Sequence, residues 1–184
     1  MNKKLAVIIS FSIALLLIST LIVTATPEKE AINQSIDYLE QKNYNLAIDK
    51  LEEAIQLLRE KAKLEFNHIT FVQNEVPGFG MYAAREDHVF AQGETFLIYG
   101  EPKNYTVKEI GQGRYEIHIK EDLYILDMEG NILFGQKDFL DYHIFSHAPN
   151  QELFITNTIT QTSPFPLGQY QFQLVLKDVF SQKT

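Results

Sequence analysis

The sequence predicts an α+β protein whose helical and strand parts follow one another: an N-terminal apolar helix, an αα-hairpin and an antiparallel β-sandwich. Residues 5–23 carry no charge, and residues 26–64 repeat apolar side chains at helical spacing. Residues 65–184 instead show short alternating runs separated by Gly, Pro and Asn. Since strands do not alternate with helices, a parallel α/β sheet is disfavoured.

Composition limits the class of protein. The 184 residues suffice for one main domain with a small appendage, and a hydrophobic content of 45% supports a real core. The net charge of −8 disfavours nucleic acid as a partner, because an acidic surface repels phosphates. The chain has no cysteine, which excludes disulfides, thiolate metal sites, a cysteine nucleophile and lipid attachment at a lipoprotein cysteine.

Residues 1–25 are predicted to direct export. Lys3 and Lys4 give a positive start, Leu5–Val23 is an apolar run of 19 residues, and small residues precede a plausible cleavage site after Ala25. Cleaved signals usually have an apolar run of about 7–15 residues, whereas a membrane span needs about 20. The sequence therefore leaves two alternatives, a cleaved signal peptide and an uncleaved membrane anchor.

Both alternatives place the rest of the chain outside the cytoplasm, because the two lysines stay inside. A short Lys-Lys start is typical of bacterial leaders. We therefore expect the periplasm or the extracytoplasmic face of the inner membrane, with membrane contact through the N-terminal segment if it is not cleaved.

Residues 26–64 are predicted to form the αα-hairpin. Thr26-Pro27-Glu28 is a helix start, with a hydroxyl residue before the helix, a proline at its first position and an acid in its first turn. Asn43 marks the end of the first helix. The segments on either side carry apolar or small residues at helical spacing, namely Ala31, Ile32, Ser35, Ile36 and Leu39, then Ala47, Ile48, Leu51, Ala54, Ile55 and Leu58.

The small residues, Tyr38 and the run YNLAIDKLEEAI resemble a single tetratricopeptide repeat. The large residues of that repeat's first turn are missing, and no second copy follows. One such repeat cannot bury its own apolar face, since about three are needed for stability. Ile32, Ile36 and Leu39 must therefore rest on the strand domain or the partner helix, or dock to another protein or a second copy. A plain helical stalk is the third alternative.

Residues 65–184 are predicted to form the sandwich. The clearest strand is Thr95–Tyr99, within the turn-bounded stretch Gln92–Asn104, and we expect Phe96 and Ile98 to be buried. Roughly seven or eight short strands with such punctuation are typical of an antiparallel sandwich. The other predicted strands are Phe66–Val72, Met81–Ala84, Arg114–Lys120, Leu123–Leu126, Ile132–Phe134, Phe139–Phe145, Leu153–Thr160 and Gln169–Lys177.

The runs GETFLIYGEP, YEIHIKEDLYILDMEGNIL and PLGQYQFQLVLKD together resemble extracytoplasmic immunoglobulin-like or macroglobulin-type domains. The resemblance implies a sandwich fold over about 100 residues and no particular activity. Such domains normally continue into a final strand, whereas this chain stops at Thr184. We expect either a short strand at Phe180–Lys183 or an open sheet edge, which is a template for strand addition by a partner.

No residue set predicts catalysis, so we expect no enzyme, no cofactor and no metal site. His143 and His147 would share a metal in a helix, but in a strand they lie about 13 Å apart. Catalytic carboxylates need to face each other across a cleft with separated pKa values. The paired acids here are typical of solvated turns: Glu86 with Asp87, Glu121 with Asp122, and Asp138 with Asp141.

Three loop aromatics complete the candidate interaction surface. Phe79 and Tyr82 lie in a glycine-flanked loop and Phe165 between two prolines, where they suit peptide or sugar contact or close the end of the core. With the apolar hairpin residues, they favour a non-catalytic exported envelope protein that acts as a protein–protein interaction module. Its expected partner is an envelope protein or itself. The alternative is a carbohydrate- or peptide-binding module on the Tyr82 and Phe165 loops.

Overall fold

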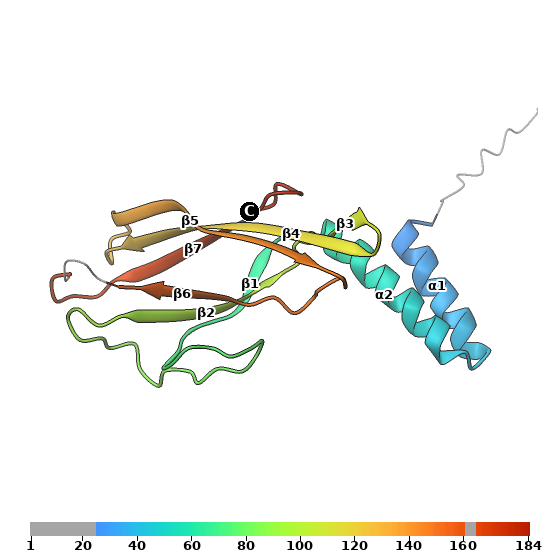
Figure 1. Cartoon of the computed structure of the whole chain (residues 1–184), viewed down its shortest axis with the longest axis horizontal. Helices are drawn as coiled ribbons and strands as arrows, with labels where there is room; N and C mark the ends of the chain where they lie inside the picture. The colour runs from blue at the N-terminus through green and yellow to red at the C-terminus, as the bar shows by residue number, and fades with distance from the viewer. Residues whose placement is uncertain (1–24, 161–164) are drawn as a thin grey trace, which may run out of the picture.

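The computed structural model describes residues 25–160 and 165–184, so the predicted leader up to residue 24 lies outside the described residues. Two helices come first and antiparallel strands follow, which confirms the predicted α+β order (Figure 1). Within the described ranges, no helix has the length and apolar character needed to cross a bilayer.

The helices α1 (Pro27–Glu40) and α2 (Tyr44–Lys61) form the predicted hairpin, side by side at one end of the molecule (Figure 1). Proline is the first residue of α1, as its fixed φ favours, and Lys42 turns the chain with a positive φ of 59°. Small residues allow the two helices to approach closely. The small residues at this crossing are at most 2% exposed: Ala31, Ser35, Ala47 and Ala54.

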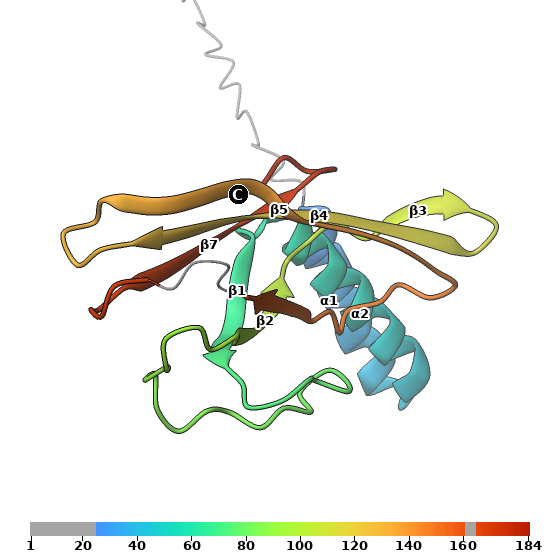
Figure 2. The same ribbon diagram turned by 60° about the vertical axis from the view of Figure 1, so that its left-hand side comes forward.

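The strands form two antiparallel sheets, and Figure 2 shows one lying over the other. The first sheet has the order β1-β2-β6. In the second, β4 pairs with β5 along one edge and with β3 and β7 along the other. The strands are β1 (Glu65–Phe71), β2 (Phe96–Lys103), β3 (Lys108–Gly111), β4 (Arg114–Leu126), β5 (Ile132–Ser146), β6 (Ile155–Ile159) and β7 (Gln171–Asp178).

The core lies between the facing sides of these sheets. Ile117 and Ile119 of β4 pack in one buried cluster with Ile155 of β6. Both Phe96 and Ile98 are buried as predicted, and β2 is the central strand of its sheet. The alternation of β4 therefore has one dry side and one polar side.

Strand lengths differ from the prediction. Arg114–Lys120 and Leu123–Leu126 belong to one continuous β4, and Ile132–Phe134 and Phe139–Phe145 belong to one continuous β5. A bulge makes this possible: the register shifts opposite Asp122, and Asp138 takes a positive φ of 48°. The charged residues that suggested a break are thus accommodated inside the strands.

Other segments also differ from the prediction. Met81–Ala84 is not a strand, because only Ala84 bridges to Val72. The unpredicted β3 pairs with β4 through a tight turn in which Gly111 and Gly113 have φ of 87° and 67°. Phe180–Lys183 forms no strand, because the Asp178 carboxylate accepts hydrogen bonds from the backbone of a turn there.

Candidate functional site

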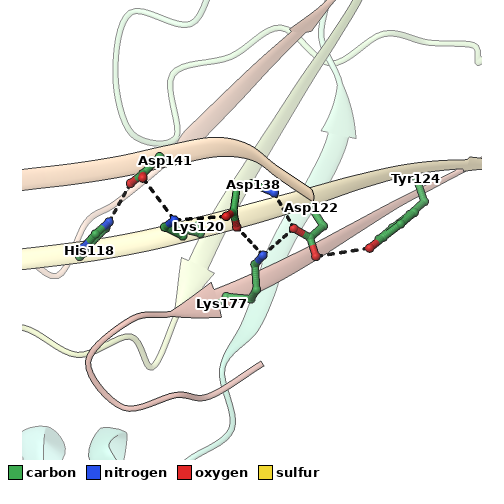
Figure 3. A network of polar contacts seen from close by, with 7 residues as sticks. All are labelled: His118, Lys120, Asp122, Tyr124, Asp138, Asp141 and Lys177. Carbon is green, nitrogen blue, oxygen red and sulfur yellow. Dashed lines mark hydrogen bonds and ion pairs between the residues drawn. The ribbon is translucent and has the colours of Figure 1, made fainter. Parts of the chain in front are cut away.

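A network of charged side chains covers the outer side of β4, β5 and β7 (Figure 3). Alternation along β4 places His118, Lys120, Asp122 and Tyr124 on the same side of the sheet. At its centre, Nζ of Lys177 lies 2.6 Å from Oδ1 of Asp122. The outer side of this sheet is therefore held by ion pairs between neighbouring strands.

The same lysine also fixes the bulge of β5. Nζ of Lys177 lies 2.6 Å from Oδ1 of Asp138, whose backbone N–H donates to Oδ1 of Asp122 at 2.7 Å. The hydroxyl of Tyr124 donates to Oδ2 of Asp122 at 3.4 Å. Asp122 thus joins the bulge to its own strand and to β7.

Two histidines lie at the other end of the network. Nε2 of His118 is 2.7 Å from Oδ1 of Asp141, and Nε2 of His143 is 2.6 Å from Oε1 of Glu116. The imidazole rings stack with their centroids 4.3 Å apart. The structure thus pairs His143 with a histidine on the neighbouring strand, a contact that the local spacing to His147 did not predict.

The charged groups of this network are stabilised in their ionised forms. Hydrogen bonds from Lys177 and then Lys120 lower the pKa of Asp138, and His118 lowers that of Asp141. Burial opposes ionisation of Asp122, but Lys177 and the Asp138 N–H together lower its pKa. The network therefore supplies fixed charges to the sheet surface.

Part of the network is open to solvent, since the side chains of Asp138 and Asp141 are 47% and 51% exposed. Asp141 and His118 meet as an acid–histidine pair, but neither lines a described cavity. The described residues also contain no group of three or more acids and histidines able to hold a metal ion. We therefore assign the network to holding three strands together.

Replacing Lys177 with Met is expected to lower the free energy of unfolding by about 1–3 kcal/mol, because Asp122 would stay largely buried without its cation. Chemical denaturation at pH 7 measures this change. Lys137→Met, at an exposed position of β5, is the matched control and should change stability by less than about 0.5 kcal/mol. Equal effects of the two substitutions would contradict the role given to Lys177.

A cavity of about 790 Å³ lies between the sheets. Five phenylalanines and several uncharged polar side chains line it, and its described lining contains no Asp, Glu, Lys or Arg. Four of the phenylalanines contact one another edge-on. These phenylalanines are Phe71, Phe90, Phe96 and Phe172. An apolar group is the kind of ligand that such a lining accepts.

The three predicted loop aromatics do not gather at one place. Phe165 lines this cavity, and its ring lies 5.4 Å from the ring of Tyr170. Tyr82 instead stacks on the buried Tyr99 with centroids 4.3 Å apart, whereas Phe79 is exposed. No described cavity is lined by both Tyr82 and Phe165.

The hairpin carries the largest aliphatic side chains outward. Ile32, Ile36 and Leu39 follow one another at spacings of four and three residues, as do the exposed residues of α2 at spacings of three and four. Exposure in this set runs from 37% at Ile32 to 52% at Ile48. The whole set, called here the hairpin face, is Ile32, Ile36, Leu39, Ile48, Leu51, Ile55 and Leu58.

The two stripes of the hairpin face lie on the same side of the hairpin. In each helix the stripe residues come one or four positions after a buried small residue, which places them about 40° to about 100° further round the axis in the direction of increasing residue number. Because the helices run antiparallel, this common direction brings both stripes to one side. Small residues at the crossing thus allow the helices to pack closely, and the long side chains remain outside the contact between them.

The hairpin meets the strand domain through polar contacts. Nε2 of Gln151 donates to Oε1 of Gln56 at 3.1 Å, and Arg59 also hydrogen-bonds to Gln151. Nζ of Lys183 donates to the carbonyl of Arg59 at 2.8 Å. These contacts lie toward the C-terminal end of α2, and they leave the hairpin face exposed.

No protein-family model matches the chain, and none of the curated proteins matches it. Neither the tetratricopeptide-like nor the immunoglobulin-like resemblance gains support from a family match. Function is therefore inferred from the charged network, the inter-sheet cavity and the hairpin face. Of these, the hairpin face consists entirely of large aliphatic side chains that are 37–52% exposed.

Proposed function

We propose that this chain is a non-catalytic exported envelope protein that acts as a protein–protein interaction module, with the hairpin face as its contact surface. The observation that carries the proposal is the exposure of seven large aliphatic side chains on one side of two helices. Contiguous apolar surface of this kind marks contact sites in soluble proteins, because water leaves it when a partner binds.

The remaining parts of the chain have supporting roles in this proposal. Residues 1–25 export the chain and either leave it in the periplasm or anchor it to the inner membrane. The two-sheet domain is an immunoglobulin-like sandwich, supported by its antiparallel pairing and buried inner faces. The hairpin is a single tetratricopeptide-like unit, and its need for a neighbouring apolar surface agrees with the exposure of its face.

The partner we infer is a second copy of this chain. Two charged residues, Lys29 and Glu40, border the hairpin face at opposite ends of α1. They continue the helical spacing of Ile36, because steps of four, three and four residues lead from Lys29 through Asn33 and Ile36 to Glu40. Both charged residues are exposed. In a two-fold antiparallel arrangement, each Lys29 lies opposite the other copy's Glu40, and the apolar stripes cover each other.

Photo-crosslinking in the cell tests this arrangement with the full chain. A photoreactive residue at Ile36 should give a covalent product of twice the mass of the chain. The same residue at Asp37, also exposed but on another side of α1, is the matched control and should give none. A product of another mass at Ile36 would support an interaction module but overturn the second copy as its partner.

Charge exchange gives an independent measurement. Lys29→Glu or Glu40→Lys alone should reduce the Ile36 crosslink several-fold, because each places like charges opposite one another. The double exchange restores opposite charges and should recover the product. Absence of any product at Ile36, with the chain folded and exported, would overturn the hairpin face as a contact surface.

The inter-sheet cavity favours a second candidate, a module that binds an apolar peptide segment. Its lining combines aromatic rings, which suit apolar side chains, with amides such as those of Gln92 and Gln171, which suit a peptide backbone. Leu167, 91% exposed, borders this cavity. The same crosslinking experiment separates the candidates, because a peptide ligand would be captured from Leu167 and a hairpin partner from Ile36.

A further inference from the structure

A buried acid and a buried amide meet between the two sheets. Glu121 of β4 is 0% exposed and Asn157 of β6 is 3% exposed. Nδ2 of Asn157 donates to Oε1 of Glu121 at 2.7 Å. This is a side-chain hydrogen bond between strands of different sheets, 36 residues apart in the chain.

The second polar atom of each side chain has no hydrogen-bond partner among the described residues. Oε2 of Glu121 and Oδ1 of Asn157 are buried and accept no hydrogen bond. An ionised carboxylate and an amide oxygen are both acceptors, so neither can satisfy the other. A protonated carboxyl group carries one O–H donor, which is the group that this pair lacks.

We propose that the two sheets are joined by a proton: Glu121 is protonated in the folded protein, and its Oε2–H donates to Oδ1 of Asn157. Two hydrogen bonds then connect the acid and the amide side by side, so that both carboxyl oxygens and both polar atoms of the amide have a partner. When the proton leaves, the buried charge and the unpaired amide oxygen both destabilise the contact between β4 and β6.

Among the described residues, the groups that act on the Glu121 carboxyl include no cation that could replace the proton. Its cross-strand neighbours are Leu140 on β5 and Leu176 on β7, and the adjacent Asp122 carries a negative charge. Burial raises the pKa of Glu121 to about 7; the Asn157 amide opposes the rise and Asp122 adds to it. The surroundings therefore favour the neutral acid at mildly acidic pH.

The raised pKa fixes the sign of the pH dependence. Stability that depends on the bound proton is fully present below the ordinary glutamate value of 4.5 and is lost as the pH rises through about 7. Over this interval the ratio of folded to unfolded protein should fall by about two to three orders of magnitude from this group alone.

Chemical denaturation from pH 5 to pH 8.5 tests the proposal. Glu121→Gln keeps both hydrogen bonds, since its amide can donate to Oδ1 of Asn157 and accept from Nδ2. This variant should lose the fall in stability that the unmodified chain shows over that range. Glu129→Gln, at an exposed position in the β4–β5 turn, is the matched control and should retain the fall.

Infrared spectroscopy with labelled glutamate measures the protonation state in the unmodified chain directly, and the variant serves to assign the band. At pH 5.5 the folded protein should show a buried protonated carboxyl band, absent from Glu121→Gln, that disappears above neutral pH. An ionised Glu121 at pH 5.5 would overturn the proposal. So would a pH dependence identical in the unmodified chain and a folded Glu121→Gln variant.

Discussion

Replacing Phe96 with Ala is expected to lower the free energy of unfolding by about 3–5 kcal/mol, the range for removing a buried phenylalanine ring. The ring lies between the sheets, with centroids 4.6 Å from Phe90 and 5.1 Å from Phe172. Its loss removes apolar contacts from a loop, from β1 and from β7 at the same time. Because the region already contains a cavity, collapse of the surroundings would recover little of the loss.

The comparison that isolates burial is Phe134→Ala. This phenylalanine on β5 is 41% exposed, so the same chemical change should cost about 1 kcal/mol or less. Urea unfolding of both variants under one buffer condition measures the difference. A nearly neutral result at Phe96 would mean that the inter-sheet space does not carry the stability we assign to it.

The fold class was predictable because local patterns were strong. Ile117 and Ile119 alternate with His118 and Lys120, and this period of two reports a strand with one dry side whatever its partners are. The hairpin was equally visible, since helical spacing and the Thr26-Pro27 start depend on neighbouring residues only. Both features became real elements, although β4 continues to Leu126, beyond the predicted strand end at Lys120.

Contacts between distant segments were not predictable in the same way. Two acids adjacent in sequence, Glu121 and Asp122, point to opposite sides of β4 and meet different partners. Asn157 contacts Glu121, and Lys177 contacts Asp122, only because the sheets place β6 and β7 beside this part of β4. Nothing local distinguishes such an acid pair from one in a solvated turn, so the sequence predicted the common case.

The hairpin face shows a third kind of limit. Spacing identified the stripe of Ile32, Ile36 and Leu39. We expected it to rest on the strand domain or the partner helix, but the structure leaves these side chains 37–48% exposed. The buried Ala31 and Ser35 then determine that α2 packs beside this stripe, leaving it exposed. Sequence periodicity finds an apolar stripe, but the angle at which two helices meet decides how much of it they bury.

Replacing Asp178 with Ala is expected to cost about 3 kcal/mol, because one carboxylate serves the backbone of two segments. Its Oδ2 accepts the Thr106 N–H at 2.7 Å, and its Oδ1 accepts the N–H groups of Phe180 and Ser181 at 2.9 and 3.2 Å. Removing it leaves these partly buried donors without their acceptor. The turn that ends β7 and the segment before β3 should then both exchange amide hydrogens faster.

Asp178→Asn separates the charge from the shape. Its amide oxygen can replace one carboxylate oxygen, while its NH₂ group opposes the donor on the other side, so an intermediate loss is expected. Burial opposes ionisation of Asp178, but the hydrogen bonds lower its pKa. Its contribution is therefore present above the ordinary value of 3.8 and lost as the pH falls through the lower folded pKa. Acid unfolding should be less steep in Asp178→Asn, and an unchanged acid transition would contradict this role.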